Sequence, residues 1–136
     1  MKGMLQETNG ETAVAAAETA VDLGKLLSDH HGSEVVVMDM RPLNFWTDFF
    51  IIATVTSSTH LSGLERHIKD YTRENGLEIL RRSSKSDISD EWSLMDLGNI
   101  VIHLMTARAR SFFELERLWS SATLIYEEKP YSSKSS

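Results

Sequence analysis

Residues 48–71 read DFFIIATVTSSTHLSGLERHIKDY, and this stretch decides the fold. Residues 48–55 are an apolar run rich in β-branched and aromatic side chains, which is typical of a strand buried on both faces. The hydroxyl-rich residues 56–60 then offer several helix N-caps. After them comes an apolar stripe at helical spacing, made by Leu61, Leu64, Ile68 and Tyr71. A buried strand that leads directly into an amphipathic helix indicates an α/β domain.

Upstream of this stretch the sequence predicts one long helix and one more strand. Residues 12–31 are rich in alanine, the best helix former, and we expect Gly32 to cap this helix at its C-terminus. Apolar residues recur in it near helical spacing at Val14, Ala17, Val21 and Leu27. EVVVMDM (34–40) is a second continuous apolar run, and Pro42 ends it.

Downstream, Gly76 ends the second helix and LEIL (77–80) predicts a short strand. Residues 81–91 are polar and indicate an exposed loop. WSLM and IVIHLM then flank a turn at 96–99, which predicts a β-hairpin. A last helix is expected over 111–122, with Phe112, Leu115, Trp119 and Ala122 on one face.

The length of 136 residues and this element order predict one α/β domain with a mixed sheet of about five strands covered by helices. We expect a flexible N-terminus at 1–11, the domain at 12–126 and a disordered tail at 127–136. The strand order does not follow from the sequence.

Composition and charge restrict the classes of function and partner that fit this chain. Fourteen basic and 20 acidic residues give a net charge of −6, whereas proteins that grip nucleic-acid phosphates usually carry a basic surplus. A protein partner is therefore favoured over direct nucleic-acid contact. Cysteine is absent, which excludes disulfides and thiolate chemistry. No segment is apolar enough for a membrane helix, and Glu18 interrupts the N-terminal apolar run, so we expect a cytoplasmic protein.

No set of residues predicts catalysis, a metal or a cofactor. The common phosphate-binding loops are absent, and no serine lies in a GxSxG motif. Gly32-Ser33 with Asp39 resembles a nucleotidyltransferase pattern, but Arg41 stands where the second metal-binding carboxylate is needed. His30 and His31 are adjacent on a helix and do not share a face, and His60 and His67 could share one but have no evident third ligand. His103 lies inside an apolar strand and is interpreted as a hydrogen-bonded core or interface residue.

The hairpin is the least ordinary feature. Strand alternation places Trp92, Leu94 and Asp96 on one side, and Ser93, Met95 and Leu97 on the other. One set must pack on the core, which leaves the other, with the residues of the turn, for solvent or a partner. Apolar side chains with a polar rim favour a protein interface, in which tryptophan is a common anchor. The alternative is that Trp92 and Leu97 only close the end of the core.

Three motifs in this order resemble the ribosomal silencing factor family, also called Iojap-like. They are WTDFFIIATVTSSTHLSGLERHI (46–68), DEWSLMDLGNIVIHLM (90–105) and RARSFFELERLW (108–119). Each motif is weak alone, but their order and spacing are specific, and the resemblance spans about residues 14–124. Asn99 replaces the usual aspartate, Phe113 the frequent tyrosine, and the usual Glu-Gly before Trp92 is missing.

The resemblance implies a fold remotely like a nucleotidyltransferase, without its catalytic carboxylates. It also implies a non-enzyme that binds the large ribosomal subunit through its fourteenth protein, blocks subunit joining and represses translation when nutrients are scarce. The implied contact residues are Trp92, Met95, Asp96, Leu97, Gly98 and Asn99. Two alternatives stay open: a nucleotide-handling enzyme, and an adaptor that uses the hairpin on another partner. The apolar hairpin also favours a two-fold homodimer of the free chain.

Overall fold

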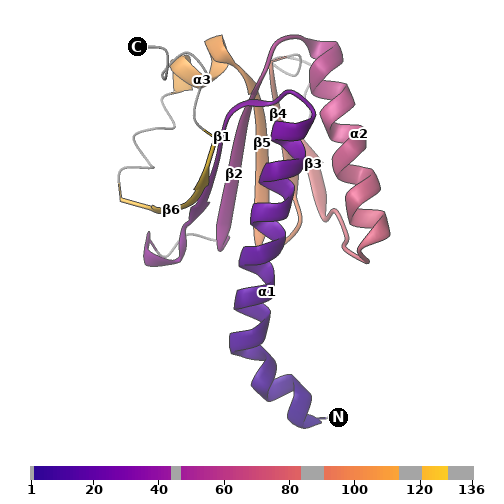
Figure 1. Ribbon diagram of the computed structural model, residues 1–136, viewed down its shortest axis with the longest axis vertical. Coiled ribbons are helices and arrows are strands. Elements are labelled where there is room, and N and C mark those ends of the chain that lie inside the picture. The colour runs from indigo at the N-terminus through magenta and orange to yellow at the C-terminus, as the bar shows by residue number, and fades with distance from the viewer. Residues whose placement is uncertain (1, 44–46, 84–90, 114–120, 129–136) are drawn as a thin grey trace.

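Six strands form a mixed sheet whose spatial order is β3-β4-β5-β2-β1-β6 in the computed structural model (Figure 1). The structure describes residues 2–43, 47–83, 91–113 and 121–128. Its helices are α1 (Lys2–Asp29), a short 3-10 turn η1 (Arg41–Leu43), α2 (Ser58–Glu74) and α3 (Ala107–Phe113). Its strands are β1 (Ser33–Asp39), β2 (Phe49–Val55), β3 (Arg81–Ser83), β4 (Trp92–Asp96), β5 (Ile100–Thr106) and β6 (Thr123–Glu127).

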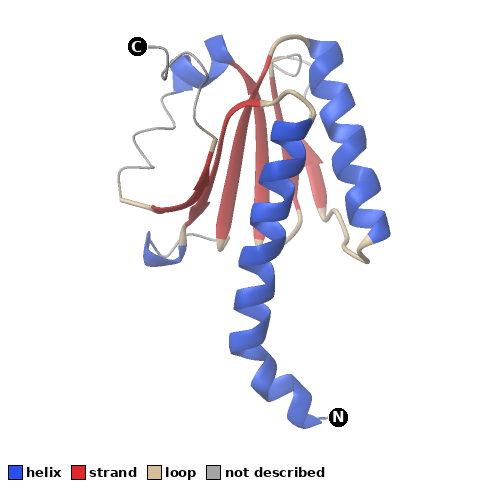
Figure 2. Cartoon of the chain, in the orientation of Figure 1, coloured by secondary structure: helices blue, strands red, loops and turns tan. Residues whose placement is uncertain are grey.

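The centre of the sheet is one parallel pair in an otherwise antiparallel arrangement. β2 pairs with β5 in parallel, from Phe49 opposite Ile100 to Val55 opposite Thr106. The other four pairings are antiparallel. α1 and α2 cover the same face of the sheet, and α1 continues well beyond its edge (Figure 2). The expected α/β class with a mixed sheet is confirmed, with one strand more than expected.

Two buried clusters lie on the two faces of the sheet. The first core lies under α1 and α2, and its members are Ala16, Ala20, Leu23, Leu27, Val35, Val37, Phe49, Ile51, Ala53, Val55, Leu61, Leu64, Ile68, Met95, Ile100, Ile102 and Leu104. The second core, on the other face, consists of Val36, Met38, Met40, Phe50, Ile52, Val101, Met105 and Ala109. Strands β1, β2 and β5 alternate between the two cores, which is why their sequences are apolar at nearly every position.

The buried stripe of α1 differs from the expected one. The buried positions in the described part of this stripe are Ala16, Ala20, Leu23, Gly24 and Leu27, whereas Ala17 and Val21 lie at the margin. Small residues on this stripe bring the helix close to the sheet: a Cβ on Gly24 would lie 2.6 Å from Val37 Cγ2. The helix also begins at Lys2 rather than at Thr12, since residues 2–11 contain mostly good helix formers.

The C-terminus of α1 corrects the expected role of Gly32. His31, not the glycine, takes the left-handed conformation, with φ 72°. The Gly32 N–H donates to Leu27 O at 2.7 Å and the His31 N–H to Ser28 O at 3.1 Å, which is the Schellman arrangement. Glycine is still needed after it, because a Cβ on Gly32 would lie 2.8 Å from Leu27 O.

The start and end of α2 agree with the prediction. Ser57 is the N-cap, and its hydroxyl accepts a hydrogen bond from the His60 N–H at 3.0 Å. The helix ends at Glu74, and Gly76 follows in a left-handed conformation with φ 68°. The predicted stripe is buried at Leu61, Leu64 and Ile68, and Tyr71 packs at the margin of the first core.

The edges of the sheet differ most from prediction. Residues 77–80 are not a strand; β3 comes directly after them, at 81–83. β6 was not expected at all. The last helix begins at Ala107 rather than at 111, because Thr106 caps it, and residues 121–122 are not helical. Edge strands are short and half-exposed, so their sequences lack the continuous apolar runs of the central strands. Expectations for Leu115, Trp119 and the tail after Glu128 lie outside the described residues.

Candidate functional site

The predicted hairpin is confirmed as the antiparallel pair β4–β5, with Trp92 opposite Met105 and Asp96 opposite Val101. Its turn is closed by the Leu97 N–H, which donates to Ile100 O at 2.8 Å. Gly98 takes φ 101°, a conformation that side-chain-bearing residues rarely adopt. The glycine in the motif is therefore required by the backbone of the turn.

Asp96 holds this turn from within. Its Oδ1 accepts a hydrogen bond from the Gly98 N–H at 2.8 Å, and its Oδ2 accepts one from Arg81 Nη2 at 3.1 Å. The carboxylate is therefore bound on one side to the turn and on the other to β3. Asp96 is only 6% exposed, so its charge serves the fold of the hairpin more than its outer surface.

The turn is also tied to the start of β2. The Thr47 hydroxyl donates to Gly98 O at 3.3 Å, and the Phe49 N–H donates to Asn99 O at 3.0 Å. These contacts use the backbone of the turn, and Asn99 is half-buried. The turn is thus held by the hairpin, by β3 and by β2.

An exposed leucine lies beside the turn. Leu80 is 59% exposed, and a Cβ on Gly98 would lie 3.4 Å from Leu80 Cδ1. Leu97 packs partly against the first core. We call Leu80, Arg81, Asp96, Leu97, Gly98 and Asn99 the turn end of the hairpin. It combines exposed apolar surface with a rigid polar loop.

Two hairpin residues point into the first core. Met95 is fully buried, so its side chain supports the hairpin and is not available to a partner in this conformation. Ser93 is also fully buried, and its hydroxyl donates to Glu65 Oε2 of α2. Glu65 was not singled out from the sequence. The sequence did contain a signal for it: Glu65 is four residues after Leu61, which places its carboxylate on the buried face of the helix.

Trp92 lies at the other end of β4 and faces the second core. Its Nε1–H donates to His103 Nδ1 at 3.1 Å, with the ring centroids 5.9 Å apart. His103 is 5% exposed and meets Phe50 edge-on, with centroids 4.8 Å apart. Burial lowers the pKa of His103 to about 4, so the imidazole is neutral near pH 7.

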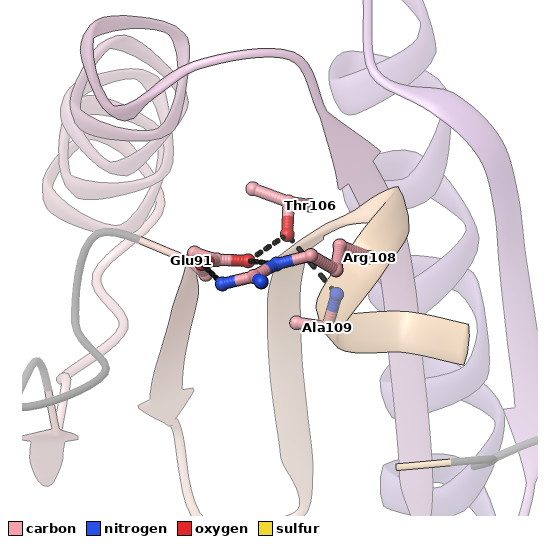
Figure 3. Close-up of polar contacts among 4 residues, drawn as sticks. All are labelled: Glu91, Thr106, Arg108 and Ala109. Carbon is pink, nitrogen blue, oxygen red and sulfur yellow. Dashed lines mark hydrogen bonds and ion pairs between the residues drawn. The ribbon is translucent and has the colours of Figure 1, made fainter. Parts of the chain in front are cut away.

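A polar cluster includes Glu91, the residue that precedes Trp92, and Figure 3 shows it with Thr106, Arg108 and Ala109. The Glu91 carboxylate accepts hydrogen bonds from the Thr106 hydroxyl at 2.8 Å and from Arg108, with which it forms an ion pair. Arg108 thereby lowers the pKa of Glu91. The Thr106 hydroxyl also accepts from the Ala109 N–H at 3.1 Å and so caps α3. We call Glu91, Trp92, His103, Thr106 and Arg108 the tryptophan end.

The structure does not bring the predicted site residues into one cluster. At about 3.3 Å per strand residue, Trp92 and Leu97 lie roughly 16 Å apart along the chain direction. They also pack on opposite faces of the sheet, Trp92 on the second core and Leu97 on the first. The predicted residues therefore lie on two surfaces joined by β4.

The residues considered for catalysis have structural partners. Asp39 forms a bidentate ion pair with Arg41, at 2.7 and 2.8 Å, which lowers the pKa of this carboxyl. The rings of His30 and His67 stack with centroids 3.6 Å apart, and His60 Nε2 lies 3.1 Å from His30 O. Burial, and then the neighbouring His30, lower the pKa of His67. Within the described ranges, no three histidine or acidic residues are grouped to hold a metal ion.

Arg110 is a buried cation that the sequence did not reveal. Its Nη1 donates to Glu34 O at 2.9 Å and to Thr54 Oγ1 at 2.7 Å, which ties α3 to β1 and β2. Glu34 lies in a bulge of β1 with φ 46°.

Of the helices that the structure describes, none has the length and apolarity to cross a membrane.

Comparison with known proteins gives consistent matches. A family model described as "Ribosomal silencing factor during starvation" matches residues 13–136. A protein named ribosomal silencing factor RsfS from Treponema pallidum is 32% identical over 106 residues, which are 78% of this chain and 94% of that protein. The chloroplastic protein Iojap of Arabidopsis thaliana is 32% identical over 116 residues, which are 85% of this chain but 47% of that longer protein.

Solved structures show the same fold. A crystal structure from Bacillus halodurans has a TM-score of 0.64 and 26% identity, and the match covers 82% of this chain and 97% of that one. A second, from Chromobacterium violaceum, has a TM-score of 0.65 and 25% identity, with 84% and 86% covered.

Proposed function

The chain belongs to the RsfS family of ribosomal silencing factors, and we propose from this that it represses translation by binding the large ribosomal subunit. The proposed partner is the fourteenth protein of that subunit. The domain would act by steric exclusion: once bound on the intersubunit face, its bulk occupies space that the small subunit needs. This mechanism requires neither a catalytic group nor a cofactor.

The observation that carries the proposal is the rigid hairpin with apolar surface at both ends. Its turn is held by Asp96 at 2.8 Å from the Gly98 N–H, and Leu80 stands 59% exposed beside it. At the other end, Trp92 is half-buried next to an ion pair. Apolar side chains presented on fixed backbone and ringed by polar groups are typical of protein interfaces.

The proposed roles follow from the burial of each residue. Trp92 and Leu97 are the apolar anchors; Gly98 and Asn99 offer backbone and amide groups. Asp96 holds the turn, and Met95 supports the hairpin from the core. Asn99 has no charge to pair with a basic partner residue, so we expect its contribution to be small.

Charge supports a basic partner. The chain carries a net charge of −6, and ribosomal proteins are typically basic, so complementary fields would speed their encounter. The nucleotide-handling alternative has lost support, because Arg41 neutralises Asp39 at the place where a metal would have to bind. An adaptor that uses the hairpin on another partner is an outcome of the experiment below.

The test is sedimentation of the purified chain with separated ribosomal subunits, together with an assay of subunit joining. We expect co-migration with the large subunit alone and fewer joined ribosomes. Leu124→Ala is the matched control for the Leu97→Ala variant. Leu124 is an exposed leucine on β6, at the opposite edge of the sheet from β3 and β4. A folded chain that migrates with neither subunit would contradict the proposal and favour the adaptor.

A cytoplasmic location and a homodimer of the free chain complete the proposal. The homologues include proteins named for chloroplasts and mitochondria, so fractionation of cells is the direct test of location. Light scattering over a range of concentrations tests the dimer, and a strict monomer would exclude it.

A further inference from the structure

Trp92 and His103 form a cross-strand pair within the hairpin. Trp92 is opposite Met105 in the β4–β5 register, so His103 is its diagonal neighbour on the same face of the sheet. Aromatic side chains are long enough to contact a diagonal neighbour, and here the two rings form a hydrogen bond of 3.1 Å. The pair is thus set by the hairpin itself.

The protonation of His103 is fixed by this bond. Indole N–H is only a donor, so His103 Nδ1 must be the acceptor and the imidazole proton must be on Nε2. Nε2 is buried and has no hydrogen-bond partner among the residues that the structure describes. A buried N–H without a partner is destabilising, and an apolar side chain of similar size would avoid it. Packing alone therefore does not account for a histidine at this position.

We propose that His103 is a positioning residue for partner binding: its Nδ1 fixes the orientation in which Trp92 is presented to the ribosomal protein. This inference rests on the proposed function, because it takes Trp92 as a contact residue. A tryptophan whose ring is already held in one orientation loses less freedom when it binds, and the affinity rises accordingly. His103 acts only through Trp92, since it is itself almost fully buried.

The test is a double-mutant cycle on binding to the large subunit. Trp92→Phe keeps an aromatic ring and removes the N–H donor; His103→Leu removes the acceptor and fills most of the space. We expect His103→Leu to weaken binding about five-fold, the value of one ordinary hydrogen bond. In the Trp92→Phe background the same change should have no further effect, because the bond is already absent.

A second variant and a control separate positioning from folding. His103→Asn places an amide oxygen close to the site of Nδ1 and should recover part of the affinity. Ile102→Val is the control: Ile102 is the neighbour on β5, fully buried on the opposite face, and its truncation lowers stability without touching Trp92. It should bind as tightly as the parent.

The free protein gives a readout that affinity does not. The proton NMR signal of the Trp92 indole N–H, assigned by its loss in Trp92→Phe, should move upfield in His103→Leu and stay in place in Ile102→Val.

The inference is overturned if His103→Leu weakens binding equally in both backgrounds, if it leaves binding unchanged, or if Trp92→Ala binds as the parent does. In this last case Trp92 leaves the proposed site while ribosome binding stands. If the parent itself does not bind, the proposed function and the inference both fall.

Discussion

The two ends of the hairpin are stabilised in different ways. At the turn end the backbone is held by a hydrogen bond to the Asp96 carboxylate and by a glycine in a conformation that residues with side chains rarely adopt. At the tryptophan end the indole of Trp92 is hydrogen-bonded to the buried imidazole of His103, and a surface ion pair lies beside them. The first end depends on hydrogen bonds to the backbone of the turn, whereas the second depends on contacts between side chains. Mutations and pH should therefore act on them separately.

The largest expected difference is in the pH dependence of stability. His103 has a pKa of about 4 when folded and about 6.5 when unfolded, so between these values the unfolded chain binds a proton that the folded chain does not. Stability is therefore full above pH 6.5 and falls as the pH drops to 4, by about 3 kcal/mol in total. Urea unfolding between pH 7 and 4 should show this loss in the parent and not in His103→Leu. An equal loss in both would show that another group titrates.

The next effect is on binding. Trp92→Ala should cost about 2 kcal/mol or more of the free energy of binding to the large subunit, roughly a thirty-fold rise in Kd, as expected of an anchor. Leu97→Ala measures the same quantity at the turn end, with Leu124→Ala as the control. Equal losses at both ends would mean that the partner spans the whole of β4. A loss at one end only would define which surface is the site.

Asp96 should contribute more to the stability of the fold than to the surface that a partner contacts. Asp96→Ala removes the acceptor for the Gly98 N–H and the partner of Arg81, and we expect a loss of about 1–2 kcal/mol in the free energy of unfolding. Asp96→Asn retains an oxygen for the Gly98 N–H and should lose less. Chemical denaturation measures both. If Asn were as destabilising as Ala, the ion pair with Arg81 would be the dominant contact.

The smallest effect separates two glycines. Gly98→Ala forces a side chain into φ 101° and should cost about 1 kcal/mol of stability. Gly63 lies in α2 with open space around its Cβ position, so Gly63→Ala should stabilise the protein by about 0.5–1 kcal/mol. Thermal unfolding of the two variants should therefore shift in opposite directions. A stable Gly98→Ala would show that the turn can take another conformation.

Local patterns were enough to predict the central fold. The apolar runs of β1, β2 and β5, an N-cap within residues 56–60 and the hairpin turn each depend on neighbouring residues, and each is confirmed. β6 and the displacement of β3 could not be predicted, because an edge strand owes its stability to a partner far away in the chain. The same holds for the stripe of α1, whose register is set by the close approach of Gly24 to Val37.

The candidate site was predicted as a set of residues but not as an arrangement. Strand alternation separated Trp92 from Met95 correctly, yet it could not decide which face the helices cover. Burial of Met95 and the bond between Trp92 and His103 both depend on that decision. The histidine was interpreted from the sequence as a core residue, and its tautomer could only follow from the geometry.

The parallel pairing of β2 with β5 has a consequence for the order of folding. Its paired residues are roughly fifty positions apart in the chain, whereas those of the hairpin are neighbours across a short turn. Closing the longer loop is slower, so we expect the hairpin to form while β2 is still absent and His103 is still in water. A refolding chain at mildly acidic pH must then release the proton of His103 before β2 can close over it. Deprotonation of one side chain thereby becomes a step in the assembly of the sheet.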